Sequence, residues 1–139
     1  MGSHGTNQLR ELVGMVRNQE TYLSTTSALY AVAVAVLVFS FYQQEEHFLA
    51  RTGIALAGLL VGGTWYMIVA RTSVCTSHWK AKILALESDL GVPQTFRISG
   101  ETPNGMPKQR ILQLATGAVL AYWAVCLAYA AVNLVADMI

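Results

Sequence analysis

The side chains with metal-binding chemistry fall into two short clusters. Cys75 and His78 lie three residues apart, and His47 follows Glu45 and Glu46. A zinc ion in a protein normally takes three or four ligands, and each His pairing here supplies two. We therefore expect solvated histidines at a membrane interface, with no metal site and no cofactor.

Acid–base and nucleophilic chemistry also lack the residues that they need. Glu87 and Asp89 are two positions apart, which places the two carboxyl groups on different faces of a helix. The sequence contains no Ser-His-Asp set, no Cys-His pair and no glycine-rich phosphate loop in a suitable context. These patterns predict a protein that is not an enzyme.

Long uncharged segments dominate the chain. Of its 139 residues, 54% are hydrophobic and 12% are charged, about half the charged share of an average soluble domain. A helix needs about 20 apolar residues to cross a bilayer. The sequence therefore predicts an all-α integral membrane protein whose lipid-embedded spans are the uncharged runs 22–42, 52–70 and 111–136. The net charge of +1 gives no basic footprint for nucleic acid, so we expect no nucleic-acid partner.

Polar groups inside these spans are few. A proton or ion path would need an ionisable residue within a span, and none of the three contains one. Asn133 is expected to hydrogen-bond to a neighbouring helix rather than to serve transport. A pore lined by the hydroxyl groups of residues 24–27 stays open as an alternative, and Tyr122 and Trp123 are expected to pack, or else to line a lipid or quinone groove.

The connections between the spans predict the topology. The loop at 43–50 is short enough to close an antiparallel hairpin, whereas the segment from Arg71 to Arg110, both included, holds six basic residues. Basic residues favour the cytoplasmic side, so we expect a cytoplasmic N-terminus and a C-terminus outside. The predicted segments are an N-terminal amphipathic helix (1–21), a transmembrane hairpin (22–71), a cytoplasmic amphipathic helix with a Pro/Gly loop (72–109) and a third transmembrane helix (110–139).

The stretch after the second span has the spacing of an amphipathic helix. Its apolar residues step by four, three and four, Gly91 can adopt the left-handed conformation that ends a helix, and Pro93 prevents continuation. Lys80, Lys82 and Glu87 are expected to lie away from this apolar stripe. We expect the stripe either to lie on the membrane surface or to pack against a neighbouring subunit; its members are Trp79, Ile83, Leu86 and Leu90.

Three stretches resemble known bacterial membrane proteins: "RNQETYLSTTSALYA", "GTWYMIVARTSVCTSHWKAKILALESDLG" and the following "VPQTFRI". They are similar to the short RipA-type inner-membrane proteins and, more loosely, to the SLATT effector domains. The resemblance covers about residues 9–98 and leaves the third span outside its pattern. It implies an oligomeric protein of the bacterial inner membrane and, for the SLATT comparison, a membrane-disrupting or pore-like effector.

Small residues on each span mark where helix backbones can approach closely, because lipid provides no hydrophobic drive for helix association. Each face is expected to pack within one subunit or against another chain, and at least one of the three to do the latter. The sequence thus predicts a homo-oligomer; an accessory subunit of a larger redox or transport complex is the alternative, and a small channel or transporter the third choice. The faces are Gly58 and Gly62 in the second span, Gly117 and Ala121 in the third, and Ser24, Ala28, Ala31 and Ala35 in the first.

Overall fold

The protein is all-helical in the residues that its computed structural model describes, which are 2–44, 47–93 and 108–137. Three helices follow one another along the chain: α1 (Gly2–Gln43), α2 (Phe48–Asp89) and α3 (Lys108–Asp137). All three are long and apolar enough to cross a membrane. The prediction of an all-α membrane protein with three apolar helices is therefore confirmed.

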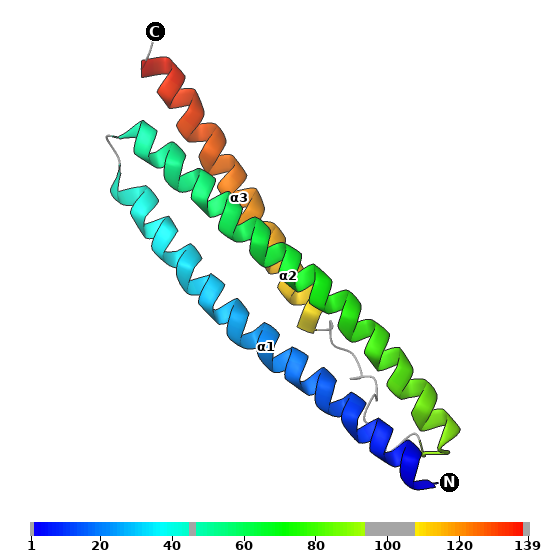
Figure 1. Ribbon diagram of the computed structural model, residues 1–139. Coiled ribbons are helices and arrows are strands. Elements are labelled where there is room, and N and C mark those ends of the chain that lie inside the picture. The colour runs from blue at the N-terminus through cyan, green and yellow to red at the C-terminus, as the bar shows by residue number, and fades with distance from the viewer. Residues whose placement is uncertain (1, 45–46, 94–107, 138–139) are drawn as a thin grey trace.

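The central helix is α2, which packs against α1 on one side and α3 on the other (Figure 1). Successive helices run in opposite directions. The chain's N-terminus lies beside the C-terminal end of α2, and its C-terminus lies at the opposite end of the molecule. α3 is 30 residues long against 42 for each of the other two, so one end of the α1–α2 pair extends past it.

The turn between α1 and α2 is tighter than the sequence predicts. Residues 43–50 are expected to form the loop, but helix α2 already begins at Phe48. Its first turn is closed by a hydrogen bond from the Arg51 backbone N–H to the His47 carbonyl, at 3.0 Å. A connection this short forces α1 and α2 into an antiparallel hairpin of two equal helices.

The amphipathic stretch 77–89 is continuous with the second span in one helix. The segment predicted as a cytoplasmic helix is the C-terminal part of α2, because nothing between Arg71 and Ser77 breaks the helix. The predicted stop is confirmed: Gly91 has φ of +67°, and the N–H groups of Gly91 and Val92 bond to the carbonyls of Ser88 and Glu87. This pair of bonds is the Schellman arrangement, which glycine favours because it lacks a Cβ atom.

The extending ends of α1 and α2 pair through a heptad pattern. Residues facing the partner helix alternate in steps of three and four, the spacing that brings one stripe of a helix against another. We call the paired segments 5–23 and 72–90 the stalk. The stripe on α1 consists of Gly5, Leu9, Leu12, Val16, Gln19 and Leu23, and that on α2 of Thr76, Trp79, Ile83, Leu86 and Leu90.

Aromatic side chains fill the core among the three apolar spans. One cluster gathers Phe41, Ala55 and Trp123, with Cys126 and Ala130 beside them. A second lies closer to the stalk, where Trp65 packs with Leu23 and Val69. There the Trp65 indole N–H donates a 3.1 Å hydrogen bond to the Ser27 hydroxyl, and its ring stacks on Tyr30.

Candidate functional site

The predicted stripe on α2 packs against α1 of the same chain. The two partners expected from the sequence were the membrane surface and a neighbouring subunit. Leu90 lies 3.0 Å from a Cβ built on Gly5, and the Thr76 hydroxyl lies 3.5 Å from the Gln19 side-chain oxygen. Ile83 sits midway between these contacts and is 4% exposed. The reason is the hairpin: two equal antiparallel helices place the N-terminal half of α1 alongside the end of α2.

Glu87 corrects a second expectation. The spacing places it away from the stripe, yet the residue is 1% exposed and its side chain is not free of interactions. It lies one turn after Ile83, so the buried face of α2 is wider than its apolar residues indicate. Lys80 and Lys82, in contrast, are exposed as expected.

The two flanks of the stalk differ. On one flank, Lys80 Nζ forms a 3.1 Å ion pair with Glu20 Oε1, which joins α2 to α1 within one chain. On the other flank lies a groove of about 400 Å³, and no ion pair joins Glu11 to Lys82 across it in the described chain. The stalk therefore has one flank bridged by charge and one flank open.

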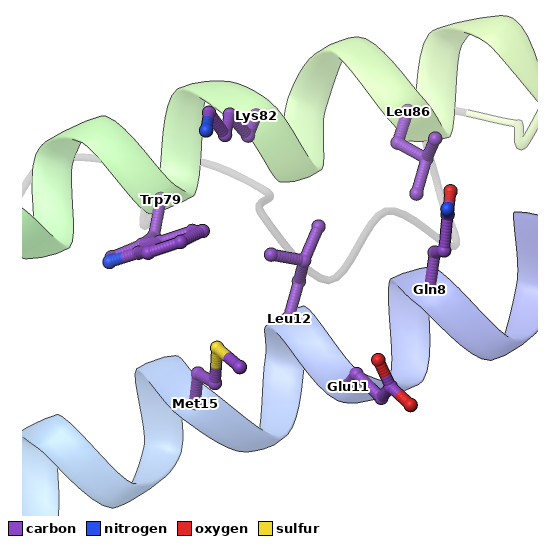
Figure 2. A pocket seen from close by; sticks show the side chains of 7 residues that line it. All are labelled: Gln8, Glu11, Leu12, Met15, Trp79, Lys82 and Leu86. Carbon is purple, nitrogen blue, oxygen red and sulfur yellow. The ribbon is translucent and has the colours of Figure 1, made fainter.

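Figure 2 shows how the open groove is built from both helices. Met15 and Trp79 lie at one end, Leu12 and Lys82 near the middle, and Gln8 and Leu86 at the other end. Met15 is 50% exposed, and the Lys82 ammonium lies 4.9 Å from the centre of the Trp79 ring. The groove thus offers an apolar floor between an acidic rim on α1, at Glu11, and a basic rim on α2.

The glycine face of α2 packs within the chain. A Cβ atom built on Gly58 would lie 2.3 Å from the Trp123 ring, and one on Gly62 would lie 3.4 Å from Leu120. Trp123 itself is fully buried, and its ring meets Phe41 edge-on at 6.1 Å between centroids. Gly58 therefore provides the space that lets α3 place a tryptophan against the backbone of α2.

The small-residue faces of the other two helices are bare. Nothing lies within 4 Å of a Cβ built on Gly117, and Ala121 is exposed. The face on α1 is exposed at all four positions, Ser24, Ala28, Ala31 and Ala35. The three predicted faces thus divide into one filled by the chain itself and two turned outward.

Several polar groups in the spans have hydrogen-bond partners within the chain. Thr25 is exposed and donates to the Thr21 carbonyl of its own helix at 3.1 Å, whereas the buried Ser27 hydroxyl accepts the bond from Trp65 of α2. Asn133 donates to the Tyr129 carbonyl of its own helix at 2.8 Å, rather than to a neighbouring helix as expected.

No group of three or more potential metal ligands gathers among the described residues. Cys75 is half-buried and His78 is exposed on α2. In the other predicted pairing, Glu45 and Glu46 lie outside the described residues, as does the proline-rich stretch 94–107.

Arg51 is a buried residue that the sequence places only at the edge of the first loop. It is 8% exposed, its Nε donates a 3.2 Å hydrogen bond to the Phe41 carbonyl, and its guanidinium lies 5.0 Å from the centre of the Phe41 ring. The carbonyls at the end of α1 carry partial negative charge and lack helical partners. Arg51 therefore caps α1 from the first turn of α2, and its closeness to the hairpin turn is the signal that could have revealed this role.

Comparisons with protein-family models, with curated proteins and with solved structures give no match to this chain.

Proposed function

We propose that this chain is a non-enzymatic subunit of a homo-oligomer in the bacterial inner membrane. In this proposal the N-terminus and the stalk are cytoplasmic and the C-terminus lies outside, as the distribution of basic residues favours. The assembly serves membrane stress physiology or a membrane-perturbing, pore-like response. The resemblance of residues 9–98 to RipA-type proteins and to SLATT domains supports this role.

The observation that carries the proposal is the division among the small-residue faces. Helix α2 uses its glycines against Trp123 of the same chain, whereas Gly117 and Ala121 on α3 are left without a neighbour. Gly and Ala at a helix surface allow the close backbone approach on which association in lipid depends. Two outward small-residue faces, one on α1 and one on α3, suit contacts with further copies of the chain.

A native mass measurement of the full chain in mild detergent tests this proposal. We expect one large, discrete homomer, and we expect Ala121→Leu to shift it to smaller species, because the added side chain keeps two backbones apart. Ala115→Leu is the matched control, since Ala115 is exposed on another face of α3. A monomer that is stable only when foreign subunits are bound would overturn the proposal and favour an accessory subunit of a larger complex.

A channel or transporter ranks below both of these roles. Of the hydroxyl groups at 24–27 that a pore would need, that of Ser27 is buried and accepts a bond from Trp65, and that of Thr25 donates to its own helix. Dye leakage from proteoliposomes tests the pore-like version of the response, and vesicles that stay tight at high protein density would count against it.

A further inference from the structure

We propose that the open groove of the stalk receives the same groove of a second copy, so that two stalks form a four-helix bundle. This inference rests on the proposed homo-oligomer and assigns one interface within it. In each half of that interface, Glu11 of one copy faces Lys82 of the other.

The first argument is that the stalk is an incomplete bundle. Among the described residues the stalk consists of two helices, because α3 does not extend along this part of the hairpin, and two helices alone leave the edges of their shared apolar stripe uncovered. The side chains left uncovered in the groove are large: Met15, Trp79 and Leu86 all line it. A second pair of helices would cover them, as it does in the usual four-helix bundle.

The second argument is the height of the lining residues along the stalk. Gly5 packs against Leu90 and Gln19 lies beside Thr76. The fourteen-residue step from Gly5 to Gln19 on α1 therefore covers the same length as the fourteen-residue step from Leu90 back to Thr76 on α2. In this register Glu11, six residues after Gly5, lies within two residues of the level of Lys82, or about 3 Å along the helix. Met15 and Trp79 share a level in the same way, as do Gln8 and Leu86 (Figure 2).

The third argument is symmetry. All copies enter the membrane with one orientation, so a twofold axis that relates two of them is parallel to the membrane normal and therefore to the stalk. Rotation about this axis keeps every residue at its own height and places α1 of one copy opposite α2 of the other. Because the lining residues match in height, Glu11 then faces Lys82 twice, and Met15 faces Trp79 twice, a favourable sulfur–aromatic contact.

The charges of the stalk also favour the open flank as the interface. Glu20 and Lys80 already satisfy one another on the bridged flank within one chain. Glu11 and Lys82 are the acidic and basic members of the groove lining, and each lacks the other as an in-chain ion-pair partner. A second copy supplies the complementary charge at both rims, whereas two bridged flanks offer one another nothing comparable.

Disulfide trapping in liposomes tests the interface directly. Full-length chains with Cys75→Ser and Cys126→Ala carry Gln8→Cys on one copy and Leu86→Cys on a differently tagged copy. We expect a disulfide-linked heterodimer after mild oxidation. The matched control places the cysteines at Arg10 and Leu84, which are exposed at similar heights on other faces of the stalk, and we expect no link there.

Charge reversal in the same trapping experiment separates pairing between copies from pairing within one copy. With Glu11→Lys on both copies, like charges meet twice, and trapping should fall about tenfold or more. With Glu11→Lys on one copy and Lys82→Glu on the other, both contacts are opposite in charge, and trapping should return. Glu20→Lys combined with Lys80→Glu on the bridged flank should leave trapping unchanged.

These experiments test the stalk interface separately from the proposed homo-oligomer. A discrete homomer by native mass that gives no Gln8→Cys to Leu86→Cys link would overturn the stalk interface and leave the homo-oligomer standing. Equal trapping in the Glu11→Lys pair and the mixed pair would also overturn it. A monomer in detergent and in liposomes would overturn both proposals.

Discussion

Close contacts between single side chains and the backbone decide how the three spans fit together. Gly58 and Trp123 illustrate this, because the tryptophan ring occupies the place that any larger residue at position 58 would need. Near the hairpin turn, the Arg51 side chain donates a 3.2 Å hydrogen bond from Nε to the Phe41 carbonyl. In both cases a residue on α2 is defined by what its neighbouring helix places against it.

Gly58→Ala should destabilise the protein. A Cβ atom at 2.3 Å from the Trp123 ring forces α2 and α3 apart, and overpacking of this kind costs about 1–3 kcal/mol. Unfolding in mixed detergent micelles with increasing SDS, followed by circular dichroism, measures this change. Gly63→Ala is the control, because nothing lies within 4 Å of a Cβ there, and its stability should equal or exceed that of the parent chain. Equal stability of the Gly58→Ala variant would contradict the observed packing.

At the level of the helices, the hairpin explains why α2 continues as one rod of 42 residues. Its first part is surrounded by α1 and α3, and its last part meets α1 in a heptad stripe. The change from a uniformly apolar span to an amphipathic end follows from the change in surroundings, because only the part outside lipid needs a polar outer face.

Ile83→Lys should open the stalk, whereas Leu84→Lys should leave it closed. Ile83 is 4% exposed on the stripe that faces α1, and Leu84 is 47% exposed one residue further on. Burial of an ammonium group without a partner costs several kcal/mol, so the stalk would separate rather than enclose it. Amide hydrogen exchange of residues 5–16 reports the opening directly. Similar exchange in both variants would show that the stripe does not hold α1.

The sequence predicts some of these elements well. Uncharged runs locate the three spans, and Gly91 followed by Pro93 locates the end of α2, because both signals are local. The partner of each face is harder to predict. A span that is apolar on every side does not mark its buried face by hydrophobicity, so Gly58, Gly117 and Ala121 look alike in sequence although only Gly58 meets a tryptophan.

The stalk could have been predicted more fully. The steps of three and four from Gly5 to Leu23 match those from Thr76 to Leu90, and an antiparallel hairpin brings the two stripes together. Glu87 could not have been placed in this way, because the heptad pattern identifies apolar positions only. Its burial depends on how wide a face α2 covers, which is a property of the packed structure.

For the whole molecule, length relates the helices to the bilayer. A helix of 42 residues is about 63 Å long, and the hydrocarbon core is about 30 Å thick. About half of the α1–α2 hairpin therefore lies outside the core. The stalk is that half, because it carries the charged residues, among them Arg10 and Arg17. α3, with 30 residues, leaves much less outside.

Labelling with a membrane-impermeant maleimide should reveal this arrangement in intact spheroplasts. In a background without Cys75 and Cys126, Ala136→Cys should react from outside, whereas Leu84→Cys should react only after the membrane is made permeable. Leu84 is an exposed stalk residue, and its replacement leaves the basic residues that set orientation unchanged. Leu60→Cys is the control within the core, because this exposed apolar residue lies in the second span and should react only in detergent. Reaction of Leu84→Cys from outside would reverse the proposed orientation, and reaction of Leu60→Cys in sealed membranes would contradict the span itself.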